Sequence, residues 1–524
     1  MKRILALTLS LVCMVACVFS TGCAKGLTKE EKENALIIEY YKAGYGDLWI
    51  QELAAKFTSK TGKEVVLLPR SGNDGIKNMA TSLTSGEAHT DLFFTSKPDF
   101  EAIYRGAALA TGVRYDSWFA DLTDLYESTI DGENIKYKDK MFDAFEEYYK
   151  MPEDYDKNDK ELYYSNRYFF VPWVTGMNGF VVNMDKWNSI FGENAAFPRT
   201  TDELLAVFES VKKSVKSNIS PLIYSEGDEY FTSFWPIFMN QYEGNEQMDR
   251  FYQGYDPVSG LRYDENMAKY DGFLKALEFF EKMLSNKNGY VHAKSKDIDF
   301  MDMQGQFLNG QALMTVNGDW LEREMINSYP DAKIKMMKTP VLSAVIEKCT
   351  TINDDATLSA VILAIDNGAE SYEGVSETDF AYIKEARNMQ LVTGNSTIAL
   401  VPVYSNQIDA AKQFLKFMAT DEGMLIFRNN TNGCELPFNY TNENNKVDAN
   451  ASMFRQSINE ALKNSETRFV NNKDKVYTTG GVNVFMYNQG LRFVKAFSTG
   501  EKSAAKYFED EVAAVKKALK DAKI

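Results

Sequence analysis

The sequence predicts an α/β protein with more than one hydrophobic core. Short apolar runs that suit buried strands alternate along the chain with amphipathic segments that suit helices. The 524 residues exceed what one core supports, since single cores stop growing near about 250–300 residues. Apolar residues make up 44% and charged residues 25%, which is the composition of a folded globular protein rather than of a disordered one.

The first 22 residues have the order of a secretory signal. Lys2 and Arg3 are followed by an apolar run over residues 4–19, which is shorter than a membrane span of about 20 residues. The run ends in Ser20-Thr21-Gly22-Cys23, which resembles the lipobox of bacterial lipoproteins, although Ser20 stands where Leu is usual. That resemblance implies a signal peptide over 1–22, a lipid on Cys23 and a tether over 23–34. A plain secretory peptide with an incidental Cys23 is the alternative.

Strands and helices then alternate from residue 35 onward. The apolar runs that predict strands are 35–40, 65–68, 91–94, 169–171 and 180–182. Helical spacing of apolar residues predicts helices near 50–57, 204–215, 273–284, 408–418 and 508–519. The second of these helices opens with Thr200-x-x-Glu203, the pattern of a capping box.

Several motifs appear in an order that resembles one known family. They are Asp91-Leu92-Phe93-Phe94, Val171-Pro172-Trp173-Val174-Thr175-Gly176, Gly179-Phe180-Val181-Val182-Asn183-Met184-Asp185, Pro198-Arg199-Thr200-Thr201-Asp202-Glu203-Leu204, Tyr230-Phe231-Thr232-Ser233-Phe234-Trp235-Pro236, Phe307–Trp320 and Ala410-Ala411-Lys412-Gln413-Phe414-Leu415. Together they resemble the extracellular solute-binding protein family 1, the sugar-binding subunits of ABC importers, which includes maltodextrin-binding proteins. The matches span roughly residues 35 to 520.

The resemblance implies a two-lobe, type II periplasmic-binding-protein-like fold. Its lobes are interleaved, joined by hinge crossings, and hold the ligand between them. We expect lobe 1 to comprise 35–145 and 312–430, and lobe 2 to comprise 146–311 and 431–524. Extra segments near 106–121, 140–167 and 365–395 have no counterpart in the motifs.

The resemblance also implies a carbohydrate as ligand and ABC permease subunits as partners. Aromatic rings stack on the C–H faces of a sugar, and polar side chains bind its hydroxyl groups. The candidate ligand-binding residues stand on segments that resemble cleft segments of the family. They are Tyr45, Ser96, Lys97, Asp99, Trp173, Thr175, Tyr224, Asp228, Trp235, Asp319 and Trp320. For most aromatic residues of this chain, packing in the core remains the alternative.

Net charge and the number of histidines argue against several other classes of function. The formal charge of −16 and the pI near 4.9 argue against a nucleic-acid binder, which needs basic patches. Two histidines argue against a His-rich metal site, so we expect no cofactor and no metal. A mature charge of −18, after loss of Lys2 and Arg3, disfavours an anionic ligand, although the charge of the cleft itself is the deciding quantity.

Three other functions are alternatives to a sugar-binding protein. A glycoside hydrolase needs two carboxylates about 5–9.5 Å apart, for which Asp228 and Glu229 are candidates. The tract from Asp154 opens like a calcium-binding EF-hand loop but lacks the Gly and Glu that such a loop requires. The same fold carrying a non-sugar solute is the closest rival.

From the sequence as a whole, we expect a monomeric, lipid-anchored binding protein on the outer face of the cell membrane, not an enzyme. Cys349 and Cys434 are expected to be unpaired, although a disulfide between them stays open.

Overall fold

The computed structural model describes most of the chain after residue 33. The described residues are 34–42, 44–71, 79, 81, 83, 89–96, 118–150, 166–214, 218–227, 230–252, 254–392, 397–446, 448–462, 465–468 and 490–522. The segment around Cys23, the acidic tract from Asp154 and the pair Asp228–Glu229 lie outside this part of the chain.

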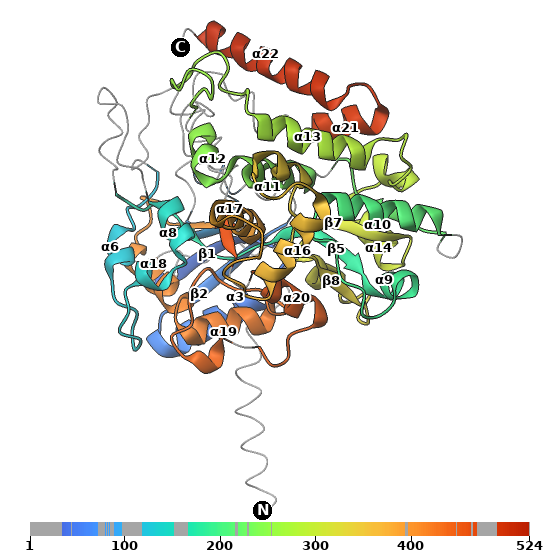
Figure 1. The fold of residues 1–524 in the computed structure, drawn as a ribbon. Helices are drawn as coiled ribbons and strands as arrows, with labels where there is room; N and C mark the ends of the chain where they lie inside the picture. Colours follow the sequence, from blue (N-terminus) through green and yellow to red (C-terminus); the bar gives the residue numbers. More distant parts are fainter. Residues whose placement is uncertain are drawn as a thin grey trace, which may run out of the picture.

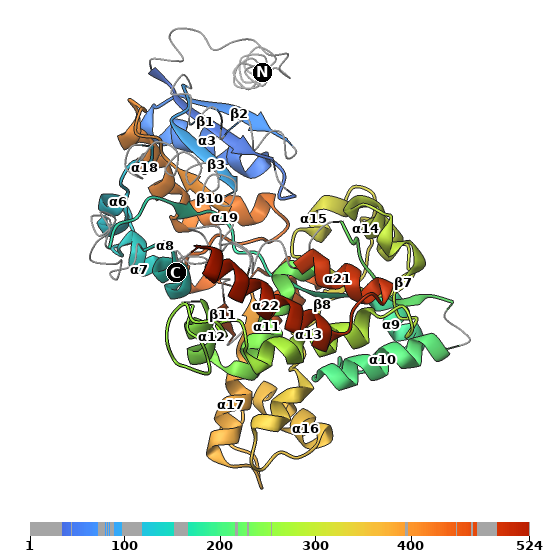
Figure 2. The same ribbon diagram turned by 90° about the horizontal axis from the view of Figure 1, so that it is seen from above.

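A five-stranded sheet forms the centre of the first lobe, lobe 1 (Figures 1 and 2). Its order is β2-β1-β3-β10-β4. The strands are β1 (Leu36–Tyr41), β2 (Val65–Arg70), β3 (Leu92–Ser96), β10 (Thr397–Leu400) and β4 (Val171–Pro172). The first three are parallel, and β10 is antiparallel to both β3 and β4. Both faces of such a sheet need cover, which explains the continuous apolar runs.

Helices from distant parts of the sequence complete the hydrophobic core around this sheet. They are α3 (Leu48–Thr61), α6 (Thr123–Glu127), α7 (Tyr137–Lys140), α8 (Asp143–Tyr149), α18 (Ile408–Met418) and α19 (Asp421–Asn430). In both views α18 and α19 lie beside the N-terminal elements β1 and α3, although more than 340 residues separate them. Phe57 of α3 and Phe414 of α18 meet with ring centroids 5.2 Å apart. Lobe 1 is therefore built from two separated stretches of chain.

A four-stranded sheet with the order β6-β7-β5-β8 forms the centre of the second lobe, lobe 2. Its strands are β5 (Asn178–Asn183), β6 (Ser220–Ile223), β7 (Ala312–Gly318) and β8 (Ile334–Met336). Strand β7 is central, pairing parallel with β6 and antiparallel with β5. All seven residues of β7 are buried, so the apolar run that precedes Asn317-Gly318-Asp319 is a core strand.

The helices of lobe 2 pack on this second sheet or on one another. They are α9 (Met184–Phe191), α10 (Thr201–Lys213), α11 (Tyr230–Glu243), α12 (Asn245–Tyr252), α13 (Asp271–Leu284), α14 (Phe300–Leu308), α15 (Leu321–Met325), α16 (Asp355–Asp366), α17 (Glu377–Asn388), α20 (Met453–Leu462), α21 (Gly490–Thr499) and α22 (Ala504–Ala522). The predicted capping box opens α10, where the Thr200 hydroxyl accepts a hydrogen bond from the Glu203 amide at 3.1 Å. Strands β9 (Met389–Leu391) and β11 (Glu466–Arg468) form a separate parallel pair.

The lobe boundaries differ from those expected from the sequence. Residues 146–174 stay with lobe 1 as far as they are described, since Tyr168 to Val174 belong to its core. Residues 312–389 belong to lobe 2, because β7 and β8 complete its sheet and α16 and α17 pack on its core. The chain rejoins the core of lobe 1 at Val392 and keeps to it through Phe438. Lobe 1 does not resume at residue 312, as expected from the sequence, because Ala312–Gly318 forms an interior strand of the lobe 2 sheet.

A buried lysine joins three segments of lobe 1. The Lys140 side chain is fully buried and its ammonium group donates to Glu133 and, at 2.8 Å, to Asp421. Asp421 also accepts hydrogen bonds from the amides of Thr441 and Asn442, each at 2.9 Å. Burial alone would raise the pKa of Asp421, but the Lys140 hydrogen bond and the two amides outweigh it and lower that pKa to about 2.

The lowered pKa of Asp421 predicts an acid-dependent contribution to stability. Because the pKa of Asp421 is lower in the folded than in the unfolded protein, the ionised carboxylate stabilises the fold above about pH 4. This contribution disappears as the pH falls from about 4 toward 2. We expect Asp421→Asn to be clearly less stable than the wild type at pH 7 and to approach it near pH 2–3. Urea unfolding of both proteins at pH 7, 5 and 3 checks this. A difference that stays constant across this range would contradict it.

Candidate functional site

Tyr45 stands in a glycine turn that follows the carboxyl end of β1. Gly46 has φ +74°, a conformation that suits glycine, and the turn directs the Tyr45 ring to where lobe 1 meets lobe 2. The ring is 4% exposed and meets Trp173 and Trp320 edge-on, at centroid distances of 5.8 and 6.5 Å. Three residues predicted for the site therefore meet, although they come from three distant segments.

Trp173 lies on the chain's first passage between the lobes. Its ring stacks on Trp49 of α3, with centroids 5.2 Å apart and planes 16° apart. Two residues later, the Thr175 amide and hydroxyl both donate to the carbonyl of Glu435, at 2.9 and 3.1 Å. Glu435 lies on the last connection between the lobes, so the hydrogen bonds of Thr175 link two connecting segments. Trp49 was not predicted, because its helical spacing in α3 suits core packing equally well.

Asp319 follows β7 directly and forms a buried ion pair. It is 2% exposed, and its Oδ2 accepts from Arg455 of α20 at 3.1 Å. Burial raises the pKa of the Asp319 carboxyl, while the Arg455 charge opposes that effect. The charges of Asp319, Arg455 and Glu324 also act on the Tyr45 hydroxyl, whose pKa burial raises well above its ordinary value. Asp319 therefore belongs to the same group as the aromatic rings.

The turn that carries Tyr45 approaches α15 of lobe 2 very closely. A Cβ atom on Gly44 would lie 2.5 Å from Oε1 of Glu324, and one on Gly46 would lie 2.9 Å from Nη2 of Arg323. Only glycine fits at these two positions without movement of α15 side chains. Burial raises the pKa of Glu324, whose Oε2 accepts from Gln304 at 2.8 Å. The two lobes are thus in direct contact around Tyr45.

Several buried polar atoms near this contact have no hydrogen-bond partner among the described residues. They are Nε1 of Trp173, Oδ1 of Asp319, Nε of Arg455, Nε of Arg323, Oε1 of Gln304 and Nδ2 of Asn317. Buried polar groups in folded proteins are nearly always hydrogen-bonded to protein, water or ligand. Donors and acceptors that lack protein partners beside aromatic rings are what a polar ligand with a flat apolar face requires. We call the group of Tyr45, Trp173, Trp320, Asp319 and Arg455 the junction cluster.

Two other predicted aromatic residues lie inside lobe 2 instead. Tyr224 is fully buried and its ring meets Phe231 at 5.1 Å, edge-on. Trp235 is 4% exposed and packs on Phe273 of α13 at 5.0 Å. Its neighbour Pro236 lies within α11, a helix with buried residues on every side, whereas the Trp-Pro pair had suggested a loop. Both residues belong to the core of lobe 2, whereas Tyr45, which is equally buried, meets Trp320 where the lobes join.

The remaining predicted residues are described only in part. Ser96 ends β3, at the same edge of the parallel strands from which the Tyr45 turn leaves. Lys97, Asp99 and Asp228 lie outside the described residues, so their role in ligand binding stays a prediction.

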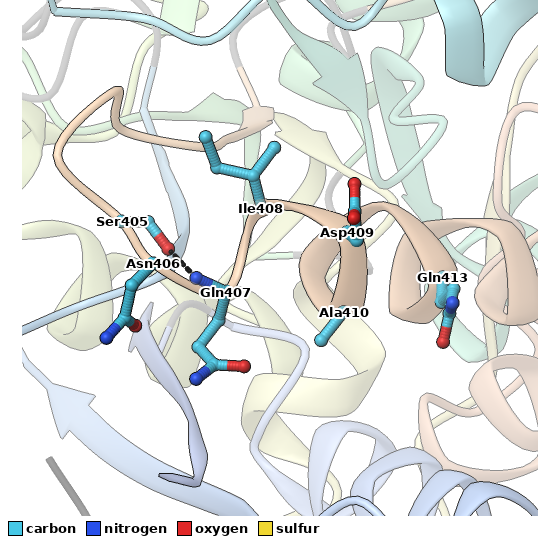
Figure 3. A pocket seen from close by; sticks show the side chains of 7 residues that line it. All are labelled: Ser405, Asn406, Gln407, Ile408, Asp409, Ala410 and Gln413. Carbon is cyan, nitrogen blue, oxygen red and sulfur yellow. Dashed lines mark hydrogen bonds between the residues drawn. The ribbon is translucent and has the colours of Figure 1, made fainter. Parts of the chain in front are cut away.

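A separate surface pocket opens at the start of α18 (Figure 3). It is lined by Ser405, Asn406, Gln407, Ile408, Asp409, Ala410 and Gln413. The Ser405 hydroxyl donates to Asp91 at 2.6 Å and accepts from the Gln407 amide at 2.9 Å. Asp91 immediately precedes β3, so this pocket lies at the amino ends of the parallel strands. It is therefore at the opposite edge of the sheet from the junction cluster.

The two cysteines in the described part of the chain are unpaired. Cys434 is buried, and burial raises the pKa of its thiol to about 12. Cys349 is half-buried and its pKa is raised to about 11, again mainly by burial. Both stay protonated near neutral pH, which keeps them unreactive. The expectation of two unpaired thiols is confirmed for this structure.

Comparison with known proteins identifies the family. The sequence profile described as bacterial extracellular solute-binding protein matches residues 44–425, which is most of the chain. The chain belongs to this family. The solute-binding protein therefore acts outside the cytoplasm, in a family associated with transport rather than with catalysis. No curated relative matches it by sequence.

Solved structures share the two-lobe fold of this solute-binding protein. The solute-binding protein RafE in complex with raffinose has a TM-score of 0.57 and 15% identity, covering 94% of this chain and 100% of its own. A Thermotoga lettingae ABC transporter solute-binding protein, bound with α-D-tagatose, has a TM-score of 0.58 and 14% identity, covering 93% and 99%. A structure from work on xylan utilization by Caldanaerobius polysaccharolyticus has a TM-score of 0.58 and 13% identity, covering 92% and 99%.

No helix in the described part of this solute-binding protein combines the length and apolar character that a membrane crossing needs.

Proposed function

We propose that this solute-binding protein captures a carbohydrate, an oligosaccharide in particular, and delivers it to the permease of an ABC importer. The observation that carries this proposal is the junction cluster. Tyr45 and Trp173 belong to lobe 1, whereas Trp320 lies between β7 and α15 of lobe 2. Unpartnered polar atoms of Trp173, Asp319 and Arg455 lie in the same cluster. Rings for stacking and polar groups for hydroxyls are thereby combined where the lobes meet.

The chemistry of the cluster suits a sugar better than a purely apolar solute. Unpartnered donors such as Nε1 of Trp173 and Nε of Arg455 can bind hydroxyl oxygens, and Oδ1 of Asp319 can accept from a hydroxyl. An apolar ligand would leave these buried groups unsatisfied, at a cost of about 1–3 kcal/mol each. The ligands named for the similar structures, raffinose and α-D-tagatose, belong to the same chemical class.

A saccharide screen tests this proposal directly. Protein lacking residues 1–33 is heated with a panel of mono- and oligosaccharides, and hits are measured by calorimetry. A ligand that binds only the folded state raises the apparent stability by an amount set by its concentration relative to Kd. At least one saccharide should shift the melting temperature, and it should be recovered intact afterwards, since the protein performs no reaction. Shifts by amino acids, peptides or organic acids alone would support a non-sugar solute instead.

The lipid anchor is part of the same proposal. Gly22-Cys23 follows an apolar signal, and we propose that Cys23 is lipidated after cleavage and holds a monomeric protein on the outer face of the membrane. A soluble protein of this kind would otherwise diffuse away from its permease.

Replacing the lipidated residue provides a test with a large effect. Cys23→Ala should move the protein from the membrane fraction into the soluble fraction, because the only proposed anchor is lost. Fractionation followed by immunoblotting measures this. Cys349→Ala, at a half-buried thiol of the folded part, is the matched control and should stay with the membranes. Retention of Cys23→Ala on membranes would refute the anchor.

A further inference from the structure

Arg455 connects the two lobes at the point where the ligand is proposed to bind. It lies on α20, whose apolar face packs with lobe 2 residues such as Met303 and Ile334. Its Nη1 donates to Asp319 Oδ2 at 3.1 Å, and its Nη2 donates to the Asp319 carbonyl at 3.3 Å. The same Nη2 lies 2.9 Å from Sγ of Cys434, a residue of the lobe 1 core. One guanidinium group thus contacts both lobes.

The local backbone is shaped to admit this side chain. Gly433 has φ +82°, and a Cβ atom there would lie 2.8 Å from Cγ of Arg455. Any other residue at 433 would be strained and would push the arginine away. The Arg455 amide also donates to the hydroxyl of Ser452 at 3.1 Å, which fixes the first turn of α20. Arg455 is only 4% exposed, so water competes little for its contacts.

The two residues that Arg455 contacts lie next to segments that hold the aromatic rings of the junction cluster. Asp319 precedes Trp320, whose ring folds back over Gly318 and reaches Tyr45. Cys434 precedes Glu435, whose carbonyl holds Thr175 and so the segment that carries Trp173. Movement of one lobe relative to the other must therefore stretch or break a contact of Arg455.

We propose that Arg455 is a positioning residue that links Asp319 of lobe 2 to Cys434 of the last crossing and so sets the angle between the lobes. Through this link the lobe angle and the spacing of Trp173 and Trp320 change together. The effect on ligand affinity rests on the carbohydrate-binding function proposed above, whereas the effect on lobe angle does not. A guanidinium suits this role because its two terminal nitrogens are held apart in a rigid planar fork, whereas a lysine offers a single nitrogen on a flexible stem.

Two substitutions separate this linking role from simple charge neutralisation. Arg455→Lys keeps a cation beside the buried Asp319 but replaces the two separate nitrogens that contact Asp319 Oδ2 and Cys434 Sγ by one. Cys434→Ala removes the lobe 1 contact and leaves the ion pair intact. Cys349→Ala removes a thiol of lobe 2 outside the junction and is the matched control. None of these leaves a buried charge without a partner, so all three are expected to fold.

Small-angle scattering of the unliganded proteins measures the lobe angle through the radius of gyration. Arg455→Lys and Cys434→Ala should both have a larger radius of gyration than the wild type, and Cys349→Ala should match it. Where the screen has found a saccharide, both variants should also bind it about tenfold more weakly, while Cys349→Ala binds normally. Wild-type dimensions in either variant would overturn the link. If no saccharide binds the wild type, the carbohydrate proposal fails, and the scattering alone still decides the role of Arg455.

Discussion

Lys140→Met is expected to lower the free energy of unfolding of lobe 1 by about 3–5 kcal/mol, since removing one partner from a buried ion pair leaves uncompensated charge. Here two carboxylates are left behind, Glu133 and Asp421, whose side chains are only 11% and 14% exposed. Asp421 keeps its two amide donors, but Glu133 loses the cation with which it pairs. The substitution also changes a network that joins the segments around 140, 421 and 441.

Urea unfolding followed by tryptophan fluorescence measures this effect, because Trp49 and Trp173 are both in the core of lobe 1. Lys412→Met is the matched control. Lys412 pairs with Asp124 at 2.6 Å, but Asp124 is 69% exposed, and such surface pairs contribute at most about 1 kcal/mol. Equal effects of the two substitutions would show that burial of Lys140 does not determine its contribution.

Trp320→Ala is expected to weaken saccharide binding by about 2 kcal/mol, roughly thirtyfold in Kd. Trp320 is half-buried, unlike the fully buried Trp173, so its truncation is expected to disturb the core less. It also lies next to Asp319, whose Oδ1 has no protein partner among the described residues. Loss of the ring removes a stacking surface at the centre of the junction cluster.

Isothermal calorimetry with the strongest saccharide of the screen measures that change. Trp118→Ala is the matched control, because Trp118 is also half-buried but lies at the other edge of the lobe 1 sheet, where its carbonyl accepts from the Val403 amide at 3.1 Å. Its affinity should equal that of the wild type. Normal binding by Trp320→Ala would remove Trp320 from the proposed site. Trp235→Ala can be measured in the same series. Because Trp235 is buried in lobe 2, this substitution is expected to lower the stability of the protein rather than to remove a contact with the ligand.

The alternation of strands and helices could be predicted because it depends on local patterns. Periodicity and the capping box at Thr200 concern neighbours within four residues. Tyr45, Trp173, Thr175, Asp319 and Trp320 could be selected as candidates because they stand on segments that resemble cleft segments of the family. Tyr224 and Trp235 have the same kind of neighbours in the sequence, yet the structure buries them in lobe 2. Local chemistry alone does not distinguish these two environments.

The residues that the sequence did not reveal act over long separations. Arg455 binds Asp319 across 136 positions, and no local pattern marks an arginine on an amphipathic helix as a junction residue. Glu435 acts through its backbone carbonyl, which carries no side-chain signature. The lobe boundaries were misplaced for a related reason. Strand β7 is apolar and ends in glycine, and nothing in its own residues shows which sheet it joins.

The position of β10 has a consequence for the order of folding during export. This strand pairs with β3 and β4, and α18 and α19 complete the same core, so lobe 1 lacks a central strand until residue 400 has emerged. Between β4 and β10 the chain supplies most of lobe 2, which can assemble from consecutive residues. Contacts between residues some 300 positions apart form slowly. We therefore expect the N-terminal 150 residues of the exported protein to wait, incompletely folded, for their C-terminal partner strand.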